Sequence, residues 1–85
     1  MAKPTAPKKS AERTPEQAFG DALREHRRKA ALSQEALADA SGYHRTYIGQ
    51  LERGEKSPSL RTIFDLATVL KVRPSVLVSA AERQI

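Results

Sequence analysis

The sequence contains no cysteine and no tryptophan, and its aromatic residues are two tyrosines and two phenylalanines. Without cysteine, neither a disulfide framework nor a cysteine-ligated zinc site can form. No apolar run approaches the roughly 18 residues that a membrane-spanning helix requires, and the polar N-terminus does not resemble a secretory signal peptide. We therefore expect a cytoplasmic protein with no membrane association and with no metal or other cofactor.

The motifs that would indicate an enzyme are also missing. There is no glycine-rich phosphate loop after a strand, no His-Glu-x-x-His motif and no arrangement of a nucleophile with a base. The serines that precede predicted helices are explained as caps. We therefore predict that the protein is not an enzyme.

Positive charge is what the sequence has in excess. The net charge is +5 and the isoelectric point is about 10.0, which favours polyanionic partners. Residues 1–13 carry +3 of this excess, include two prolines and have almost nothing apolar. They are therefore predicted to be a disordered basic tail, which either contacts DNA or is simply solvated. Residues 14–85 carry only the remaining +2, which is a weak bias for a DNA-binding domain.

The stretch from Ser33 to Arg53 predicts two short helices joined at Gly42. Ser33 is a suitable N-cap for the first helix. Gly42 is the residue type that enters the left-handed conformation without a Cβ clash, so the first helix should end there. The second helix should begin near His44 and end before Gly54.

The second of these helices has two distinct faces. Ile48 and Leu51 lie on an apolar face that must pack on the preceding helix. The opposite face is outward and carries guanidinium, carboxamide and hydroxyl groups, which pair with base edges and phosphates; its residues are Arg45, Thr46, Gly49, Gln50 and Arg53. Gly49 costs about 1 kcal/mol relative to alanine in mid-helix, which suggests that a partner approaches the backbone closely at this point.

The spaced residues of this region resemble a known family. The pattern Ser-Gln-Glu-x-Leu-Ala, then Gly42, then Tyr-Ile-x-x-Leu-Glu-Arg-Gly, then Pro-Ser-Leu is similar to the Xre/Cro-type helix-turn-helix family, the lambda-repressor-like DNA-binding domains. The resemblance covers roughly residues 16 to 80. Tyr43 departs from it, because the family usually has a small aliphatic residue at that position.

The resemblance implies roles for particular residues, because the family places the second helix in the major groove of double-stranded DNA. The base-reading residues would be Arg45, Thr46 and Gln50. The residues that contact the DNA backbone would be Gln34, Tyr47, Arg53, Lys56 and Arg61. An ion pair between Arg27 and Glu52 is also implied, and its role would be structural.

The rest of residues 14–85 completes an all-α, five-helix lambda-repressor-like bundle. Thr14, Pro15 and Gln17 predict the start of the first helix, with a buried stripe of Phe19, Ala22, Leu23, His26 and Ala30. His26 is interpreted as a hydrogen-bonded core imidazole, against the alternative of a pH sensor or metal ligand. Ser59 should cap a fourth helix and Pro74 should open a fifth. The expected buried stripes are Leu60, Ile63, Phe64, Ala67 and Leu70, with Leu66 at the edge, and then Leu77, Val78 and Ala81.

One recognition helix reads only a few base pairs, so we predict a homodimer on a two-fold-symmetric operator. The dimer interface would use the apolar residues left outside the core, Val69, Val76, Ala80 and Ile85. The alternative is an antitoxin or adaptor whose helix-turn-helix chiefly binds a protein partner, such as a toxin or RNA polymerase. Repressors of phage, controllers of restriction–modification systems and autoregulated antitoxins fit equally, and neither the operator sequence nor the choice between activation and repression follows from these residues.

Overall fold

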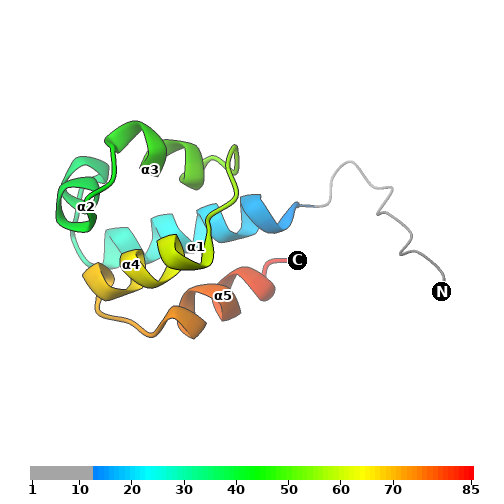
Figure 1. Ribbon diagram of the computed structural model, residues 1–85. Coiled ribbons are helices and arrows are strands. Elements are labelled where there is room, and N and C mark those ends of the chain that lie inside the picture. Colours follow the sequence, from blue (N-terminus) through cyan, green and yellow to red (C-terminus); the bar gives the residue numbers. More distant parts are fainter. Residues whose placement is uncertain (1–12) are drawn as a thin grey trace, which may run out of the picture.

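The computed structural model describes residues 13–85 as five helices around one core (Figure 1). The predicted basic tail lies outside the described residues, apart from Arg13, which forms an ion pair with Asp21. No strand occurs in the described part, so the all-α fold is confirmed. The helices are α1 (Pro15–Lys29), α2 (Gln34–Ser41), α3 (Arg45–Glu52), α4 (Leu60–Leu70) and α5 (Pro74–Glu82).

The predicted caps of α1, α2 and α4 and the predicted end of α2 are present. Thr14 and Gln17 form a capping box at the start of α1, in which each side chain accepts from the backbone N–H of the other residue. Ser33 and Ser59 cap α2 and α4 through their hydroxyl groups. Gly42 ends α2 with a φ of 83°, which is the left-handed conformation that glycine adopts without strain.

The core lies between α1 and the other helices. α1 packs against both α3 and α5, while α2 packs against α3 and α4, and Figure 1 shows α4 and α5 on one side of α1 with α3 across the other. The largest fully buried side chains come from all five helices; they are Leu23, Leu37, Ile48, Leu51, Leu66 and Leu77. Among residues 13–85, no helix is both long and apolar enough to cross a bilayer.

The contact between α1 and α3 depends on Gly20, which the sequence stripe did not include. A Cβ at this position would lie 2.4 Å from the carbonyl oxygen of Leu51 and 2.6 Å from that of Glu52. Only glycine therefore lets the end of α3 lie directly on α1. Ala30, the C-cap of α1, is exposed and was wrongly assigned to the buried stripe. His26 is half-buried, and its Nδ1 donates to the carbonyl oxygen of Ala22 at 2.9 Å.

The predicted stripe of α4 was wrong at two positions. Leu60 and Phe64 are 71% and 52% exposed, whereas Thr62 and Leu66 are buried. α4 lies between α2 and α5, so the side that carries Thr62 and Leu66 faces its neighbours. The rotation of α4 about its own axis is therefore set by its packing against neighbouring helices and not by the positions of its largest apolar side chains.

In α5 the prediction was wrong for Val78, expected to be buried, and for Ala80, expected to be exposed. Val78 is half-exposed, whereas Ala80 is 3% exposed and joins Leu77 and Ala81 in the core. The buried residues follow the spacing i, i+3, i+4 of an amphipathic helix. The two small alanines let α5 lie close to α1. Ala80 is therefore removed from the predicted dimer surface.

Candidate nucleic-acid interface

The outward face of α3 is available to a partner at its first turn. Arg45 and Thr46 are exposed, Gln50 is half-buried, and Ile48 and Leu51 are fully buried beneath them. The hydrophobic contacts of Ile48 and Leu51 fix the rotation of α3 about its axis. The polar groups of Arg45, Thr46 and Gln50 therefore project from one side of a short helix whose opposite side is packed in the core.

Gly49 lies on the same outward face but is buried, because the Arg53 side chain covers it. A Cβ at Gly49 would lie 3.0 Å from Nη1 of Arg53. Arg53 in turn donates to Glu55, from Nε to Oε2 at 2.8 Å and from Nη2 to Oε1 at 3.3 Å. These hydrogen bonds lower the pKa of the Glu55 carboxyl below its ordinary value. Two of the three guanidinium nitrogens of Arg53 are thus paired within the protein, so a phosphate would compete with Glu55 for this side chain.

The carboxylate of Glu52, at the end of α3, is the centre of a buried polar network. Arg27 donates to it from Nε at 2.6 Å and from Nη2 at 3.0 Å, and Nη1 of Arg27 also donates to the carbonyl oxygen of Leu32 at 2.8 Å. The ion pair that the resemblance implied is therefore present. Burial raises the pKa of Glu52, but the hydrogen bonds from Arg27 and Gln34 outweigh burial and hold the pKa below its ordinary value.

Two further donors complete this network, and the sequence did not indicate either role. Nε of Arg24 lies 3.3 Å from Oε1 of Glu52, and Nε2 of Gln34 lies 2.9 Å from the same oxygen. Arg24 lies three residues before Arg27, so both reach Glu52 from one side of α1. The amide nitrogen of Gln34, which was expected to meet a phosphate, is used by Glu52.

The two tyrosines of the helix-turn-helix both contact α4. The Tyr47 hydroxyl lies 3.3 Å from Oγ1 of Thr62, and either oxygen can be the donor. The Tyr43 hydroxyl donates to Oδ2 of Asp65 at 2.7 Å. The two rings lie 5.3 Å apart at an angle of 43°. The spacing of residues in the sequence gave no signal for either contact.

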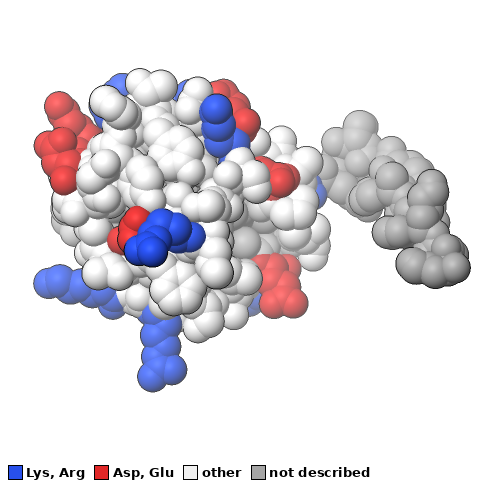
Figure 2. All heavy atoms as spheres, in the orientation of Figure 1, with Lys and Arg blue, Asp and Glu red and all other residues white. Residues whose placement is uncertain are grey.

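The remaining predicted contact residues are exposed. Lys56 lies in the loop after α3, and Arg61 lies in the first turn of α4. The positive groups on the face in Figure 2 are separate from one another, and the area over α4 and α5 is mostly uncharged. Nothing among residues 13–85 gathers three or more potential ligand side chains for a metal ion.

Comparison with known proteins gives the family. Residues 23–77 match the model of the helix-turn-helix family HTH_3, so the chain belongs to this family and the predicted resemblance is confirmed. Control protein C.SmaI of Serratia marcescens is 50% identical over 48 residues, which are 56% of this chain and 57% of that protein. Control protein C.BamHI of Bacillus amyloliquefaciens is 42% identical over 60 residues, or 69% of this chain and 74% of that protein. The chain thus spans little more than half of C.SmaI.

Solved structures agree with the fold. The clp gene regulator ClgR from C. glutamicum superposes with a TM-score of 0.85 at 28% identity, covering 89% of this chain and 97% of that one. The restriction–modification controller C.AhdI from Aeromonas hydrophila gives a TM-score of 0.70 at 48% identity, covering 72% and 92%. The five-helix, lambda-repressor-like bundle is therefore shared with gene regulators of known structure.

Proposed function

We propose that this chain is a sequence-specific, double-stranded DNA-binding transcriptional regulator that acts as a homodimer. The observation that carries the proposal is the fixed outward face of α3, where Arg45 and Thr46 are exposed above fully buried Ile48 and Leu51. Arg45, Thr46 and Gln50 would read base edges in the major groove. Similarity to the control proteins C.SmaI, C.BamHI and C.AhdI favours a controller of restriction–modification genes over the other circuits.

Lys56 and Arg61 would hold the phosphate backbone, because both side chains are exposed, one in the loop after α3 and the other in the first turn of α4. Arg53 would join them after leaving Glu55. Gln34 and Tyr47 would contribute less than the resemblance implies, since Glu52 and Thr62 already engage their polar groups. Such contacts position a protein on DNA without specifying sequence.

The dimer surface that we propose differs from the one the sequence predicted. Ala80 is buried and Val69 packs against the core, whereas Val76 and Ile85 remain exposed. The larger exposed apolar side chains on α4 and α5 are Leu60, Phe64 and Val78.

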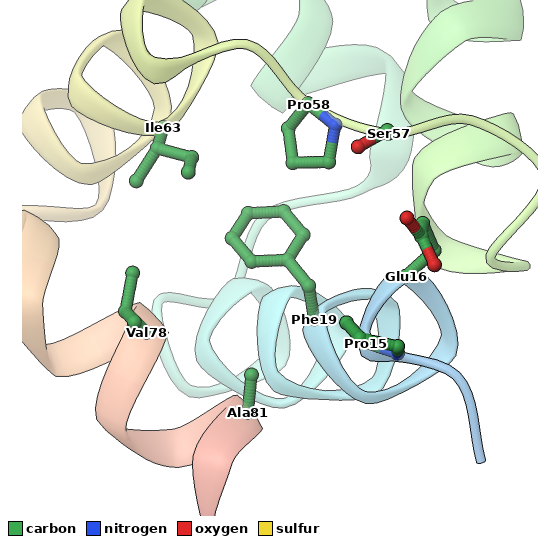
Figure 3. Close-up of a pocket in the computed structure, with 8 residues that line it drawn as sticks. All are labelled: Pro15, Glu16, Phe19, Ser57, Pro58, Ile63, Val78 and Ala81. Atoms are coloured by element: carbon green, nitrogen blue, oxygen red, sulfur yellow. The ribbon is translucent and has the colours of Figure 1, made fainter. Parts of the chain in front are cut away.

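An apolar groove of about 240 Å³ adjoins these residues. In Figure 3 the Phe19 ring points into it, between Pro58 and Ile63 on one side and Val78 on the other. Leu60 and Phe64 lie exposed on the same helix as Ile63 and line a second hollow together with Arg61. Exposed apolar side chains beside an apolar groove would pair with the same face of a second copy, as a two-fold interface requires. The two recognition helices would then meet half-sites about one helical turn, roughly 34 Å, apart.

A binding selection from random duplexes tests the DNA-binding proposal. The wild type should enrich a sequence with two-fold symmetry. Arg45→Ala should relax the preference at one position of each half-site, because one bidentate arginine–guanine pair supplies about 1–3 kcal/mol of discrimination. Lys56→Ala is the matched control, which should weaken all sequences alike. If no sequence were enriched, the alternative would be favoured, namely an antitoxin or adaptor that uses its apolar face to bind a protein.

The dimer is tested separately by sedimentation. Phe64→Glu would place two like charges near the symmetry axis and should give folded monomers that bind the selected operator weakly. Val69→Glu is not suitable, because Val69 packs against the core. Thr68→Glu, on the exposed side of α4, tests how far the interface extends. A Phe64→Glu variant that remained dimeric would contradict this surface.

A further inference from the structure

α4 has three sides with different tasks. Its outer side carries Leu60 and Phe64, which belong to the proposed dimer surface. Its core side carries Ala67 and Leu70, which are buried. Its third side faces the helix-turn-helix and carries two oxygen-bearing side chains, those of Thr62 and Asp65. α4 therefore lies between the surface for the second copy and the helices proposed to read DNA.

The connection across this third side is made by the two tyrosines. Tyr43 belongs to the turn between α2 and α3, and its hydroxyl donates to Oδ2 of Asp65 at 2.7 Å. Tyr47 belongs to α3, and its hydroxyl lies 3.3 Å from Oγ1 of Thr62. Thr62 is itself held, because the hydroxyl of Ser59 lies 3.0 Å away and Ser59 caps α4. The short contact to a carboxylate is the stronger of the two, because hydrogen bonds to ionised groups exceed neutral ones in strength.

We infer, on the basis of the proposed function, that the Tyr43–Asp65 contact fixes the recognition helix relative to the dimer surface and thereby makes the protein selective for one half-site spacing. Tyr43 is a positioning residue in this inference and does not touch DNA. Moving one half-site by a single base pair shifts it by about 3.4 Å and rotates it by roughly 35° about the DNA axis. A frame in which Tyr43 ties the turn before α3 to α4 cannot follow this change, whereas a looser frame can.

The contact can be removed without removing the packing. Tyr43→Phe keeps the ring that lies against Tyr47 and that packs against the core. Asp65 is only half-buried, so water can replace the lost hydroxyl. Asp65→Asn keeps an oxygen that accepts from Tyr43 and provides a conservative rescue, whereas Asp65→Ala does not.

The experiment measures binding of the full chain to three kinds of duplex. These are the operator obtained by selection, the same operator with one base pair inserted or deleted between half-sites, and a single half-site. The selectivity is the ratio of affinities for the selected and altered spacings. Tyr43→Phe and Asp65→Ala should each lower this ratio by about fivefold or more, while half-site affinity stays unchanged and Asp65→Asn stays near the wild type.

Ser41→Ala is the matched control. It removes a hydroxyl that bonds to the carbonyl oxygen of Leu37 within α2 and does not reach α4, so the ratio should not change. Wild-type spacing selectivity in both Tyr43→Phe and Asp65→Ala would overturn the inference. So would a parallel loss of affinity on every duplex, which would indicate a purely structural contact. A wild type that enriches no duplex at all would instead refute the proposed function, and this inference with it.

Discussion

Two glutamates of the helix-turn-helix each meet an arginine, but they stand in opposite environments. Glu52 is 2% exposed and accepts hydrogen bonds from Arg27 and from two further side chains. Glu55, three residues later, meets Arg53, and both of these side chains are about half exposed. The first pair joins α1 to the end of α3, whereas the second lies on the surface beside the proposed DNA-reading face.

The difference in burial decides what each pair does. A buried carboxylate that loses its partner leaves a charge without water, so the partners of Glu52 are part of the fold. An exposed pair gains little, because water solvates either partner when the contact opens. Arg27 is therefore committed to the structure, while Arg53 can exchange Glu55 for a phosphate with little loss of stability. The same chemistry thus serves the fold in one place and is available for binding in the other.

The largest expected effect is on stability. Glu52→Ala should lower the free energy of unfolding by about 3–5 kcal/mol, because it leaves Arg27 buried without its anion. Glu55→Ala should give no measurable change in the same urea titration. The double variant Arg27→Met/Glu52→Leu should recover much of the loss, since it removes both charges. The single variants Arg27→Met and Glu52→Leu complete the cycle, and additive effects of these two would contradict the coupling.

The next prediction concerns the pH dependence of stability that Glu52 causes. Hydrogen bonds from Arg27 and Gln34 outweigh burial and hold the folded-state pKa of Glu52 below its ordinary value of 4.5. The unfolded state therefore binds the proton more readily, so this contribution to stability is present above about pH 4.5 and is lost as the pH falls through the folded-state pKa. The stability gap between the wild type and Glu52→Gln should shrink in acid. A gap that is constant between pH 7 and pH 3 would refute this linkage.

A smaller effect is expected on DNA binding from the exposed pair. Glu55→Gln should free the Arg53 guanidinium and raise the affinity for all duplexes. The slope of log affinity against log salt concentration should become steeper by about one unit, because one more phosphate is neutralised. Glu82→Gln is the matched control, because Glu82 is also exposed but lies on α5. Both variants gain one unit of net charge, so an equal change in the two would attribute the effect to net charge alone.

The smallest expected effect comes from Gly49→Ala. The added methyl group would meet the far end of the Arg53 side chain at 3.0 Å, and that side chain can move. Since alanine is favoured over glycine by up to about 1 kcal/mol within a helix, stability should be unchanged or slightly higher. Gly20→Ala is the contrast, because its methyl group would meet backbone carbonyls and should destabilise the protein clearly. Thermal unfolding of the two variants measures both outcomes.

The sequence predicted the parts of this structure that depend on local chemistry. The caps at Thr14, Ser33 and Ser59 and the turn at Gly42 follow from neighbouring residues, and all are present. The Arg27–Glu52 contact was available only through the family resemblance, because nothing local relates residues on α1 and α3.

The errors arose where tertiary packing decides. A helical wheel of α4 favours the large apolar Phe64 for the core, but the neighbours of α4 select Thr62 and Leu66. The exchange of Val78 for Ala80 has the same origin, since helices that lie close together require small residues. The contact of Tyr43 with Asp65 joins distant segments and leaves no periodic signal in the sequence.

The packing of α1 on α5 governs how the nascent chain acquires its structure. Phe19 of α1 and Ala81 of α5 are far apart in the sequence but line the same groove, so this part of the core cannot close until α5 has left the ribosome. At roughly 5–20 residues per second, several seconds pass between the synthesis of α1 and that of α5. The helix-turn-helix is complete in sequence during this interval but lacks part of its support. The helix-turn-helix is therefore supported by a fully packed α1 only after α5 has been synthesised.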